Sequence, residues 1–498
     1  MILNDETIVA AATPAGKGAL AILRMSGPKA LAIADSVWQG ARLSECASHT
    51  AHLGYIKDEA GNVLDQAVAT VFRGPNSFTG EDSVELTLHG SQWIMREVTN
   101  LLLRRGARGA EPGEFSRRAY LNGRMDLASA EGVADLIASS SKAAHRLALR
   151  QTRGAFSKEF NTLRDKLIEL ASLLELELDF SEEDVEFADR TALMSTAELL
   201  LTKIDRLTDS YAAGRAFKEG VPVVIAGVPN VGKSTLLNAL LQEEKAIVSD
   251  IPGTTRDIIE DTCEIEGVLF RFIDTAGLRE SADKVESIGI ERARERLSQA
   301  AIILWLIDPT VPTEPQISEM METLSGIGTD RKIIPVITKT LTPGVTDSDI
   351  ARLESALSEL PYLRSAQGVN EDQNIDNDTE NDIENDIENC IENDIRIVKI
   401  SITEGKGLAY LCDTLHKAST QDYDPEKELL LTNARHYSDL LAAGKALRRA
   451  VGQMQSGASA DFIAMDIREA TAALSSLTGT ITTPDLLNSI FSHFCIGK

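Results

Sequence analysis

A phosphate-binding loop is the strongest chemical signal in the sequence. Residues 227–234 are Gly-Val-Pro-Asn-Val-Gly-Lys-Ser, the pattern G-x-x-x-x-G-K-S, and they lie between an apolar run and a helical stretch. In such a loop the backbone N–H groups surround the phosphates of a nucleotide, the lysine reaches the terminal phosphates and the serine hydroxyl binds magnesium. The spacing therefore predicts that Lys233 and Ser234 hold the phosphates and Mg²⁺ of a nucleoside triphosphate.

Two further segments, in the expected chain order, predict a GTPase. Residues 253–257 are Gly-Thr-Thr-Arg-Asp, in which Thr255 is favoured as the second hydroxyl ligand of the metal. Asp274 ends an apolar run and begins Asp-Thr-Ala-Gly, so it is placed to hold the metal through water, while the backbone of Gly277 can sense the γ-phosphate. Together with the phosphate loop, these segments indicate a GTPase of the Ras-like translation-factor class.

The water-orienting position departs from the common GTPase pattern. Many GTPases place a glutamine after the glycine of Asp-x-x-Gly, but this chain has Leu278. An apolar side chain cannot polarise water, so the catalytic group must come from elsewhere. Glu280 and Glu286 are the nearby candidates, and Glu286 is favoured by the family resemblance given below. Alternatively, both glutamates only solvate a mobile helix.

The base-reading motif also departs from the pattern. Where a GTPase should show N-K-x-D, the sequence after the apolar run 333–337 is Thr338-Lys339-Thr340-Leu341. Leu341 cannot accept the guanine protons, and each hydrogen bond to a charged acceptor is worth about 1.5–3 kcal/mol. We therefore expect a weakened guanine preference, or rescue by a neighbour such as Asp347. Lys339 remains available to stack on the base.

The elements that must position these residues follow from hydrophobic periodicity. Short apolar runs alternate with helical stretches, which predicts a doubly wound parallel sheet. The strands are expected at residues 221–226, 269–273, 301–307, 332–337 and 395–400. The sequence on either side of this α/β region has helical periodicity, so the two flanks could pack as one bundle around an inserted domain.

Four domain segments are predicted. Residues 1–125 mix strand-like runs, short helices and Gly/Pro turns, which is typical of an α+β domain. Residues 126–219 form the first part of a helical domain and residues 421–498 its second part, with the α/β domain at 220–420. Within the last, residues 371–394 contain 11 acidic residues and no Lys or Arg, a composition that favours a disordered, solvated insert.

Composition and charge limit the function classes. The 498 residues include 76 acidic and 50 basic side chains, so the net charge of -26 argues against a protein that coats nucleic acid by bulk charge. Because 11 of those charges lie in the 371–394 insert, a local RNA contact remains compatible. Five scattered cysteines without C-x-x-C favour a reducing compartment. No run of about 18 apolar residues occurs, so we expect a cytoplasmic protein without a membrane span.

Several motifs outside the phosphate loop make the chain similar to the MnmE (TrmE) family of tRNA-modification GTPases. The resemblance covers nearly the full length except the acidic insert. The motifs are Asp-Glu-Thr-Ile-Val-Ala at 5–10, Gly-Pro-Asn-Ser-Phe-Thr-Gly-Glu-Asp at 74–82, Pro-Gly-Glu-Phe-Ser at 112–116, Arg-Ala-Tyr-Leu-Asn-Gly at 118–123, the acidic segment 179–187 and Phe-Cys-Ile-Gly-Lys at 494–498.

The resemblance implies a homodimer formed through an N-terminal domain that is similar to tetrahydrofolate-binding domains and holds formyl- or methylene-tetrahydrofolate. Arg24, Glu85, Arg124 and Lys498 match the family's folate contacts. Arg124 stands where Lys is frequent, a change that keeps the charge and alters the geometry. Cys495 is implied to lie beside the folate; a buried structural thiol and a C-terminal prenylation box are the alternatives.

The resemblance also implies how the G domain works. In the family, GTP hydrolysis drives opening and closing of G domains that dimerise on nucleotide binding, with potassium supplying the charge of an arginine finger. Asn230, Ser249, Ile251 and Thr254 match the potassium site, and Glu286 matches the water-orienting glutamate. The predicted nucleotide-binding residues are Asn230, Val231, Gly232, Lys233, Ser234, Thr235, Ser249, Asp250, Ile251, Pro252, Gly253, Thr254, Thr255, Asp274, Thr275, Ala276, Gly277, Thr338 and Lys339.

The implied activity is the addition of a carboxymethylaminomethyl or aminomethyl group to carbon 5 of the wobble uridine of tRNA, in a heterotetramer with the flavoprotein MnmG. The alternative is a regulatory or ribosome-assembly GTPase without modification chemistry.

The sequence leaves alternatives open for an arginine cluster and for one histidine. The arginines at 104, 105, 108, 117 and 118 usually would form a solvated face, with tRNA or folate contact as the minority hypothesis. His89 could serve a folate pocket or cap a strand.

Overall fold

The computed structural model describes residues 6–179, 190–243, 261–273, 297–325, 331–360, 397–479 and 483–497. These residues form two compact units. The first contains residues up to Ser139, then Ala148–Asp209 and everything from Asn433 onward; the second contains Ser140–Leu147 and Ser210–Thr432. The second unit therefore extends beyond the predicted α/β domain of 220–420 at both ends. The 371–394 insert and the acidic segment after Asp179 lie outside the described residues.

The first unit begins with a seven-stranded sheet in the order β3-β4-β5-β6-β2-β1-β7. Neighbouring strands are antiparallel except β1 and β7, which are parallel. The strands are β1 (Ile8–Ala11), β2 (Leu20–Ser26), β3 (Trp38–Gln39), β4 (Thr50–Lys57), β5 (Val63–Phe72), β6 (Ser83–His89) and β7 (Arg108–Gly109).

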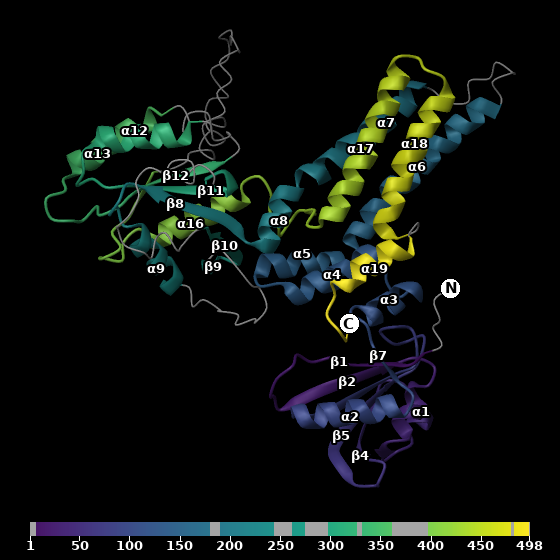
Figure 1. Cartoon of the computed structure of the whole chain (residues 1–498). Coiled ribbons are helices and arrows are strands. Elements are labelled where there is room, and N and C mark those ends of the chain that lie inside the picture. Colours follow the sequence, from purple (N-terminus) through teal and green to yellow (C-terminus); the bar gives the residue numbers. More distant parts are fainter. Residues whose placement is uncertain are drawn as a thin grey trace, which may run out of the picture. The chain divides into compact units, whose positions relative to one another are not determined.

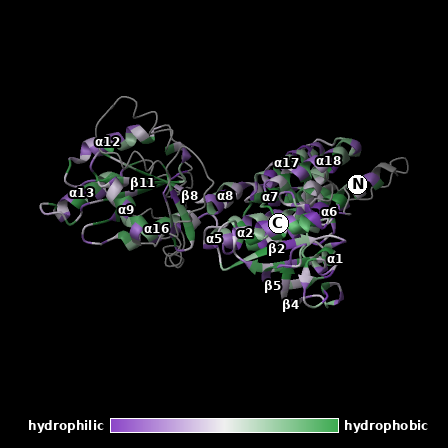
Figure 2. Ribbon diagram, turned by 60° about the horizontal axis from the view of Figure 1, so that its bottom comes forward, coloured by the Kyte–Doolittle hydropathy of each residue, from purple (hydrophilic) through white to green (hydrophobic). Residues whose placement is uncertain are grey.

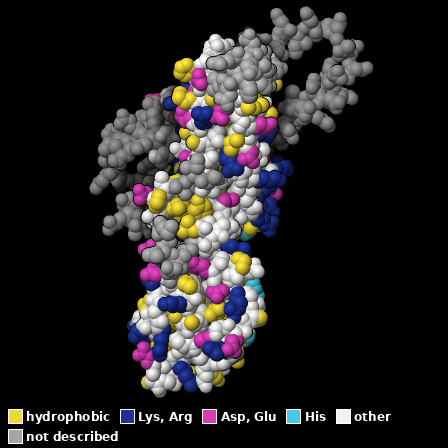
Figure 3. Space-filling model, turned by 90° about the vertical axis from the view of Figure 1, so that its right-hand side faces the viewer, with side chains coloured by type: hydrophobic (Ala, Val, Ile, Leu, Met, Phe, Trp, Pro, Cys, Tyr) yellow, Lys and Arg dark blue, Asp and Glu magenta, His cyan; other side chains and the backbone are white. Residues whose placement is uncertain are grey.

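The period-2 alternation of β1 sends its side chains to two different cores. Val9 packs with Val98 of α2 (Gln92–Arg104) and with α1 (Ala30–Asp35), which cover one face of the sheet. Ile8 and Ala10 pack with Phe115 of α3 (Glu114–Leu121) on the other face. A short 3-10 helix, Leu43–Glu45, follows β3. Figure 3 shows Lys and Arg interspersed with Asp and Glu on one face of this domain.

Helices that precede and helices that follow residues 210–432 in the sequence pack together in the first unit (Figure 1). α18 packs against α6 and α17, and α17 also packs against α7. The apolar residues of α17 that face this bundle recur at helical spacing, for example Leu440, Ala443 and Leu447. The helices are α4 (Leu127–Ala138), α6 (Ala155–Asp179), α7 (Arg190–Asp209), α17 (Ala434–Gln455), α18 (Ala460–Thr478) and α19 (Pro484–Ser492). α5 (Lys142–Thr152) follows α4.

The second unit contains a six-stranded sheet in the order β13-β12-β11-β8-β10-β9, parallel except for β9. The predicted parallel sheet is thus confirmed. The strands are β8 (Val221–Gly227), β9 (Asp261–Ile265), β10 (Val268–Phe272), β11 (Ile302–Ile307), β12 (Lys332–Ile337) and β13 (Val398–Lys399). Of the run predicted at 395–400, residues 395 and 396 lie outside the described residues, and β13 covers Val398 and Lys399.

Helices cover both faces of this sheet. Val223 and Ile225 of β8 pack with α9 and α16, whereas Val224 packs with α12 and α13. Figure 2 shows the hydrophobic character of β8 and β11. The helices are α8 (Tyr211–Glu219), α9 (Lys233–Glu243), α12 (Thr313–Leu324), α13 (Asp347–Ser358) and α16 (Leu408–Thr420). Among the described helices of both units, none combines the length and the apolar character that a bilayer span requires.

Candidate functional site

The phosphate loop joins the end of β8 to the start of α9. β8 lies between β11 and β10, where the strand order of the sheet reverses. Open α/β sheets bind ligands at this point, beyond the carboxyl ends of the strands. Its backbone takes left-handed φ values at Gly227 (134°), Asn230 (63°) and Gly232 (108°). A Cβ on Gly227 would collide with the carbonyl oxygen of Leu306 on β11, so only glycine fits there. Such left-handed residues turn successive N–H groups toward one concave side, which suits phosphate oxygens.

Lys233 is held against this loop. Its Nζ donates to the carbonyl oxygens of Gly227 at 2.8 Å and Val228 at 3.0 Å. Burial lowers the pKa of Lys233, and the negative charge of Glu319 opposes that shift. Ser234 is the second residue of α9. The predicted phosphate ligands Lys233 and Ser234 therefore lie together at the junction of the loop and the helix.

The loop after β12 is tied to the phosphate loop by two side chains. The Thr338 hydroxyl is buried and donates to the carbonyl oxygen of Val231 at 2.9 Å. Lys339 has a φ of 54°, and its Nζ donates to the carbonyl oxygen of Asn230 at 3.0 Å. The structure thus brings together Thr338, Lys339 and the phosphate loop, which the sequence had assigned to one nucleotide site.

Asp308 is a further residue of this site, and the sequence pattern alone did not single it out. It follows β11, its side chain is 3% exposed, and its carboxylate lies 2.5 Å from the Lys339 Nζ. The amide and hydroxyl of Thr310 also donate to it, at 2.9 and 2.6 Å. Burial raises the pKa of Asp308, but the hydrogen bonds from Lys339 and Thr310 outweigh burial and lower it. The sequence could have indicated Asp308 through its position, because it directly follows an apolar run that forms a parallel strand next to β8, and ligands bind at the carboxyl ends of such strands.

The base-reading loop also contacts the loop after β13. The backbone N–H and the hydroxyl of Thr340 both approach the carbonyl oxygen of Ile400, at 3.4 and 3.2 Å. Leu341, where N-K-x-D has its aspartate, is 49% exposed. Asp347 begins α13 after a capping box formed by Thr346. The weakened guanine preference stays a prediction.

Several predicted residues lie outside the described residues. These are the segment 249–255 with the expected ligands Ser249, Asp250, Ile251, Pro252, Gly253, Thr254 and Thr255, the segment 274–277 with Asp274, Thr275, Ala276 and Gly277, and the residues Leu278, Glu280 and Glu286. Their roles stay predictions.

The predicted folate residues Arg24 and Glu85 are direct cross-strand partners on β2 and β6. The Arg24 Nε donates to the Glu85 Oε1 at 2.8 Å, and Nη2 lies 2.7 Å from the same oxygen. Arg24 also reaches the chain terminus, because its Nη1 donates to the carbonyl oxygen of Gly497 at 3.4 Å. Lys498, the next residue, lies outside the described residues.

The C-terminal segment is fitted against the N-terminal domain. A Cβ on Gly497, whose φ is 94°, would collide with the carbonyl oxygen of Ala11 at the end of β1. Two residues earlier, the carbonyl oxygen of Cys495 accepts from the N–H of Gly113 at 3.4 Å, immediately before α3. The tail therefore lies along β1 and α3, close to Arg24.

Phe78 adjoins both predicted folate arginines that the structure describes. The Arg24 Cζ lies 5.4 Å from the centroid of the Phe78 ring. Phe78 and Arg124 together line a hollow of about 500 Å³, which is within the size range of small-molecule sites. Guanidinium groups and an aromatic ring are suitable partners for a planar, anionic cofactor.

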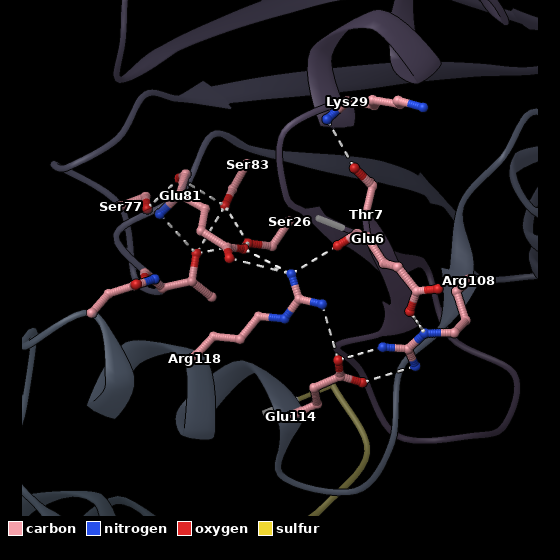
Figure 4. Close-up of polar contacts among 12 residues, drawn as sticks. Glu6, Thr7, Ser26, Lys29, Ser77, Glu81, Ser83, Arg108, Glu114 and Arg118 are labelled. Carbon is pink, nitrogen blue, oxygen red and sulfur yellow. Dashed lines mark hydrogen bonds and ion pairs between the residues drawn. The ribbon is translucent and has the colours of Figure 1, made fainter. Parts of the chain in front are cut away.

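Two members of the arginine cluster expected on a solvated face, Arg108 and Arg118, instead pair with the buried carboxylate of Glu114 (Figure 4). Arg118 has a side chain only 4% exposed, and it pairs with Glu114 at 3.0 Å and Glu81 at 3.1 Å. Arg108 pairs with Glu114 at 2.6 Å and with Glu6 at 2.6 Å. For Arg118 the solvated-face expectation is wrong, because its side chain is buried and two carboxylates neutralise its charge. The tRNA or folate alternative stays a hypothesis.

The network in Figure 4 positions the segment that carries Phe78. The Glu81 carboxylate accepts from the Ser26 hydroxyl of β2 at 2.7 Å, and Thr79 and Ser26 share a hydrogen bond of 2.7 Å. Burial raises the pKa of Glu114, but the hydrogen bonds from Arg108, the Glu111 N–H and Arg118 outweigh burial and lower it. The network is therefore charged, and it fixes the 74–82 segment against β2.

The doubly wound sheet, the glycine-lined phosphate loop and the Lys339 loop define a P-loop nucleoside triphosphatase. Two family models match the chain: "MnmE helical domain" over residues 127–495 and "GTP-binding protein TrmE N-terminus" over residues 7–124. The chain belongs to the MnmE family of tRNA modification GTPases, which confirms the resemblance, and its enzyme class is GTP hydrolase.

Curated relatives match along the whole chain. The tRNA modification GTPase MnmE of Cytophaga hutchinsonii is 45% identical over 99% of this chain and 98% of that protein. The proteins of the same name from Flavobacterium johnsoniae and Bacteroides thetaiotaomicron are 42% and 43% identical, with all of both chains covered. Solved structures are more distant: a GTP-binding protein from Sulfolobus solfataricus in complex with GDP is 16% identical over 52% of this chain and 67% of that chain, with a TM-score of 0.27.

Proposed function

We propose that this protein is a potassium-dependent GTPase that, with the flavoprotein MnmG, adds a carboxymethylaminomethyl or aminomethyl group to carbon 5 of the wobble uridine of tRNA. GTP hydrolysis drives opening and closing of its G domains. The observation that carries the proposal is that one chain combines a phosphate loop tied to the loops after β11 and β12 with a C-terminal tail that contacts Arg24, the partner of Glu85. A GTPase that acts only as a switch needs the nucleotide site but not the docked C-terminal tail.

The nucleotide site assigns roles to the residues around the phosphate loop. Lys233 binds the terminal phosphates and Ser234 the magnesium ion, with Thr255 as second ligand and Asp274 acting through water. The left-handed backbone at Asn230 and Gly232 supports this, because it gives the loop the concave shape that phosphates need. Asn230, with Ser249, Ile251 and Thr254, holds potassium, which supplies positive charge at the transferred phosphate. Glu286 orients the attacking water in place of Leu278.

The N-terminal domain holds the one-carbon donor, formyl- or methylene-tetrahydrofolate. Arg24 and Glu85 offer a donor and an acceptor side by side, which suits the amide and amine edge of a pterin. Arg124 and Lys498 bind its anionic portion, and the Cys495 thiol lies close to it. The contact between Arg24 and the Gly497 carbonyl supports this site, because it brings the terminus to the β2–β6 pair.

The assembly follows from the same proposal. The protein forms a homodimer through its N-terminal domain, and two such chains combine with two MnmG chains in a heterotetramer that acts on tRNA in the cytoplasm.

The test is reconstitution of the modification. Full-length protein, MnmG, unmodified tRNA, methylene-tetrahydrofolate as the one-carbon donor, glycine or ammonium as the amine donor, and GTP are combined in potassium or in sodium buffer, and nucleosides are quantified by mass spectrometry. We expect modified wobble uridine and faster GTP hydrolysis in potassium. Lys233→Ala should abolish both hydrolysis and modification, whereas Glu85→Gln should abolish modification and leave hydrolysis intact. Hydrolysis without any modified uridine would instead favour a regulatory or ribosome-assembly switch.

A further inference from the structure

A second hollow in the N-terminal domain lies at the other end of the β2–β6 pair. It has a volume of about 660 Å³, and Lys17, His89, Trp93 and Arg96 line it. His89 pairs in register with Leu20, whereas Glu85 pairs with Arg24. Four residues of strand separate the two places, which is about 13 Å at 3.3 Å per residue. The hollow is therefore distinct from the predicted folate contacts.

The ionisable side chains that line this hollow are all basic, in a chain whose net charge is -26. Two carboxylates lie next to them. Asp65 is buried and binds His89, and Glu97 lies 3.3 Å from the Arg96 Nε at the surface. With Lys17, the hollow offers cations from two separate segments of the chain to one anionic ligand.

His89 is held in one orientation. The Asp65 carboxylate lies 2.6 Å from the His89 Nδ1 and accepts the His89 backbone N–H at 2.9 Å. The Asp65 side chain is 6% exposed, whereas the His89 side chain is 64% exposed. A buried carboxylate thus fixes Nδ1 as the donor toward the protein, which leaves Nε2 on the exposed side of the ring. His89 therefore presents Nε2 to the exposed side as an oriented polar atom, a feature that the strand-capping alternative does not require.

Trp93 gives the hollow an exposed aromatic surface. It lies in the first turn of α2 and is 53% exposed, and Leu20, the register partner of His89, is 63% exposed. Tryptophan offers a large flat surface on which any nucleobase can stack, and neighbouring cations bind the phosphates. A base-stacking ring beside Lys and Arg is the arrangement by which proteins bind single-stranded nucleic acid.

We propose that this hollow binds a single-stranded segment of RNA, with one base stacked on Trp93, the adjacent phosphate bound by Lys17 and Arg96, and His89 Nε2 directed at the sugar or base edge. The proposal rests on the proposed function, in which tRNA is the substrate, and it adds where an unpaired nucleotide of that substrate binds. The ligand is identified by its chemistry: an unpaired base next to a phosphate.

The test measures binding of unmodified tRNA to the full-length protein by fluorescence anisotropy. Trp93→Ala should raise the Kd at least fivefold, because stacking on one aromatic ring contributes about 1–3 kcal/mol per base. Trp93→Phe should keep most of the affinity. Lys17→Ala with Arg96→Ala should weaken binding and reduce the slope of log Kd against log salt by about 1–2. GTP hydrolysis without tRNA should be unchanged in every variant.

Matched controls come from the same domain. Leu53→Ala removes another exposed apolar side chain (67% exposed), and Arg42→Ala removes a cation whose side chain is 71% exposed. Wild-type affinity in the Trp93→Ala and Lys17/Arg96 variants would overturn the proposal, as would a change confined to the oligomeric state measured by light scattering. If Trp93→Ala does not fold, the RNA affinity of the variant with Lys17→Ala and Arg96→Ala tests the proposal by itself.

Failure of this site and failure of the proposed function are distinguishable. If the wild-type protein modifies tRNA while the Trp93 and Lys17/Arg96 variants bind and modify it normally, only the RNA site is wrong. If the wild-type protein neither binds nor modifies tRNA, the proposed function fails, and the site with it.

Discussion

The hydroxyl of Thr338 donates to the backbone carbonyl oxygen of Val231 at 2.9 Å and so joins the loop after β12 to the phosphate loop. Lys339 makes a second link, through Asn230, and its ammonium is held by Asp308. The base-reading loop of this chain thus keeps its attachment to the phosphate loop, although its sequence is Thr-Lys-Thr-Leu. The attachment depends on Thr338, Lys339 and Asp308, whereas base selection is predicted to depend on position 341, so we expect the two properties to be separable.

Asp308 should contribute to nucleotide affinity through Lys339. Asp308→Asn removes the charge that holds the Lys339 ammonium, so we expect the Kd for a fluorescent GTP analogue to rise about 5- to 10-fold, the size of one charge-assisted hydrogen bond discounted for the partial exposure of Lys339. Asp413→Asn makes the same charge change on α16, where Asp413 pairs with an exposed lysine, and should leave the Kd unchanged. Equal affinity in both variants would show that Asp308 has no such role.

Gly227 should tolerate no side chain. Gly227→Ala places a methyl group against the carbonyl oxygen of Leu306 in a left-handed conformation, so we expect a lower melting temperature and loss of nucleotide binding. Gly452→Ala is the control, because Gly452 lies in α17 and an added Cβ meets nothing within 4 Å. That change should be neutral or stabilising by up to about 1 kcal/mol. Calorimetry with and without GDP measures the melting temperature and the nucleotide binding of each variant. Normal GDP binding by the Gly227→Ala protein would show that the expected collision with Leu306 does not occur.

Base selectivity should depend on position 341. Because Leu341 offers no acceptor, we expect poor discrimination between GTP and ATP, ITP or XTP in competition binding. Leu341→Asp places a carboxylate on an exposed position of the base-reading loop and should raise the preference for GTP over ATP by at least about 10-fold, since each charged hydrogen bond contributes about 1.5–3 kcal/mol. Leu341→Ala provides no acceptor and should behave like the wild type. Strict GTP selectivity of the unaltered chain would refute the prediction.

Local sequence patterns sufficed for the central strands and the phosphate loop. Parallel strands buried on both faces appear as continuous apolar runs, and the predicted run 332–337 coincides with β12. β4 was not predicted, because its exposed positions include Leu53 and Tyr55 and hide the alternation. Its pairing with β5 identifies it as a strand.

Contacts between distant residues account for most of what the sequence could not show. The burial of Arg118 depends on Glu81, which is 37 residues away, and an arginine-rich segment does not reveal which of its members are paired. Asp308 acquires its role from Lys339, 31 residues later. The approach of Gly497 to Arg24 spans 473 residues. The family resemblance indicated that last site, whereas charge and periodicity did not.

Glu131 of α4 provides a stability prediction in the helical bundle. Its carboxylate lies 2.8 Å from Arg435 and 2.7 Å from the buried ring of His436, both of α17. Burial opposes its ionisation, but the charge and hydrogen bond of His436, followed by those of Arg435, outweigh burial and lower the pKa of Glu131 from 4.5 to about 2. The folded state therefore binds this proton less readily than the unfolded chain.

A lowered folded-state pKa contributes stability above pH 4.5, which is lost as the pH falls from about 4.5 to about 2. The shift corresponds to about 3 kcal/mol, at 1.36 kcal/mol per unit. Glu131→Gln should lower the urea midpoint at pH 7, and the difference from the wild type should shrink steadily below pH 4.5. Glu175→Gln, which alters an exposed pair with Arg468, should show little difference at any pH. If the Glu131→Gln deficit stays constant between pH 7 and pH 3, the carboxylate charge is not its cause.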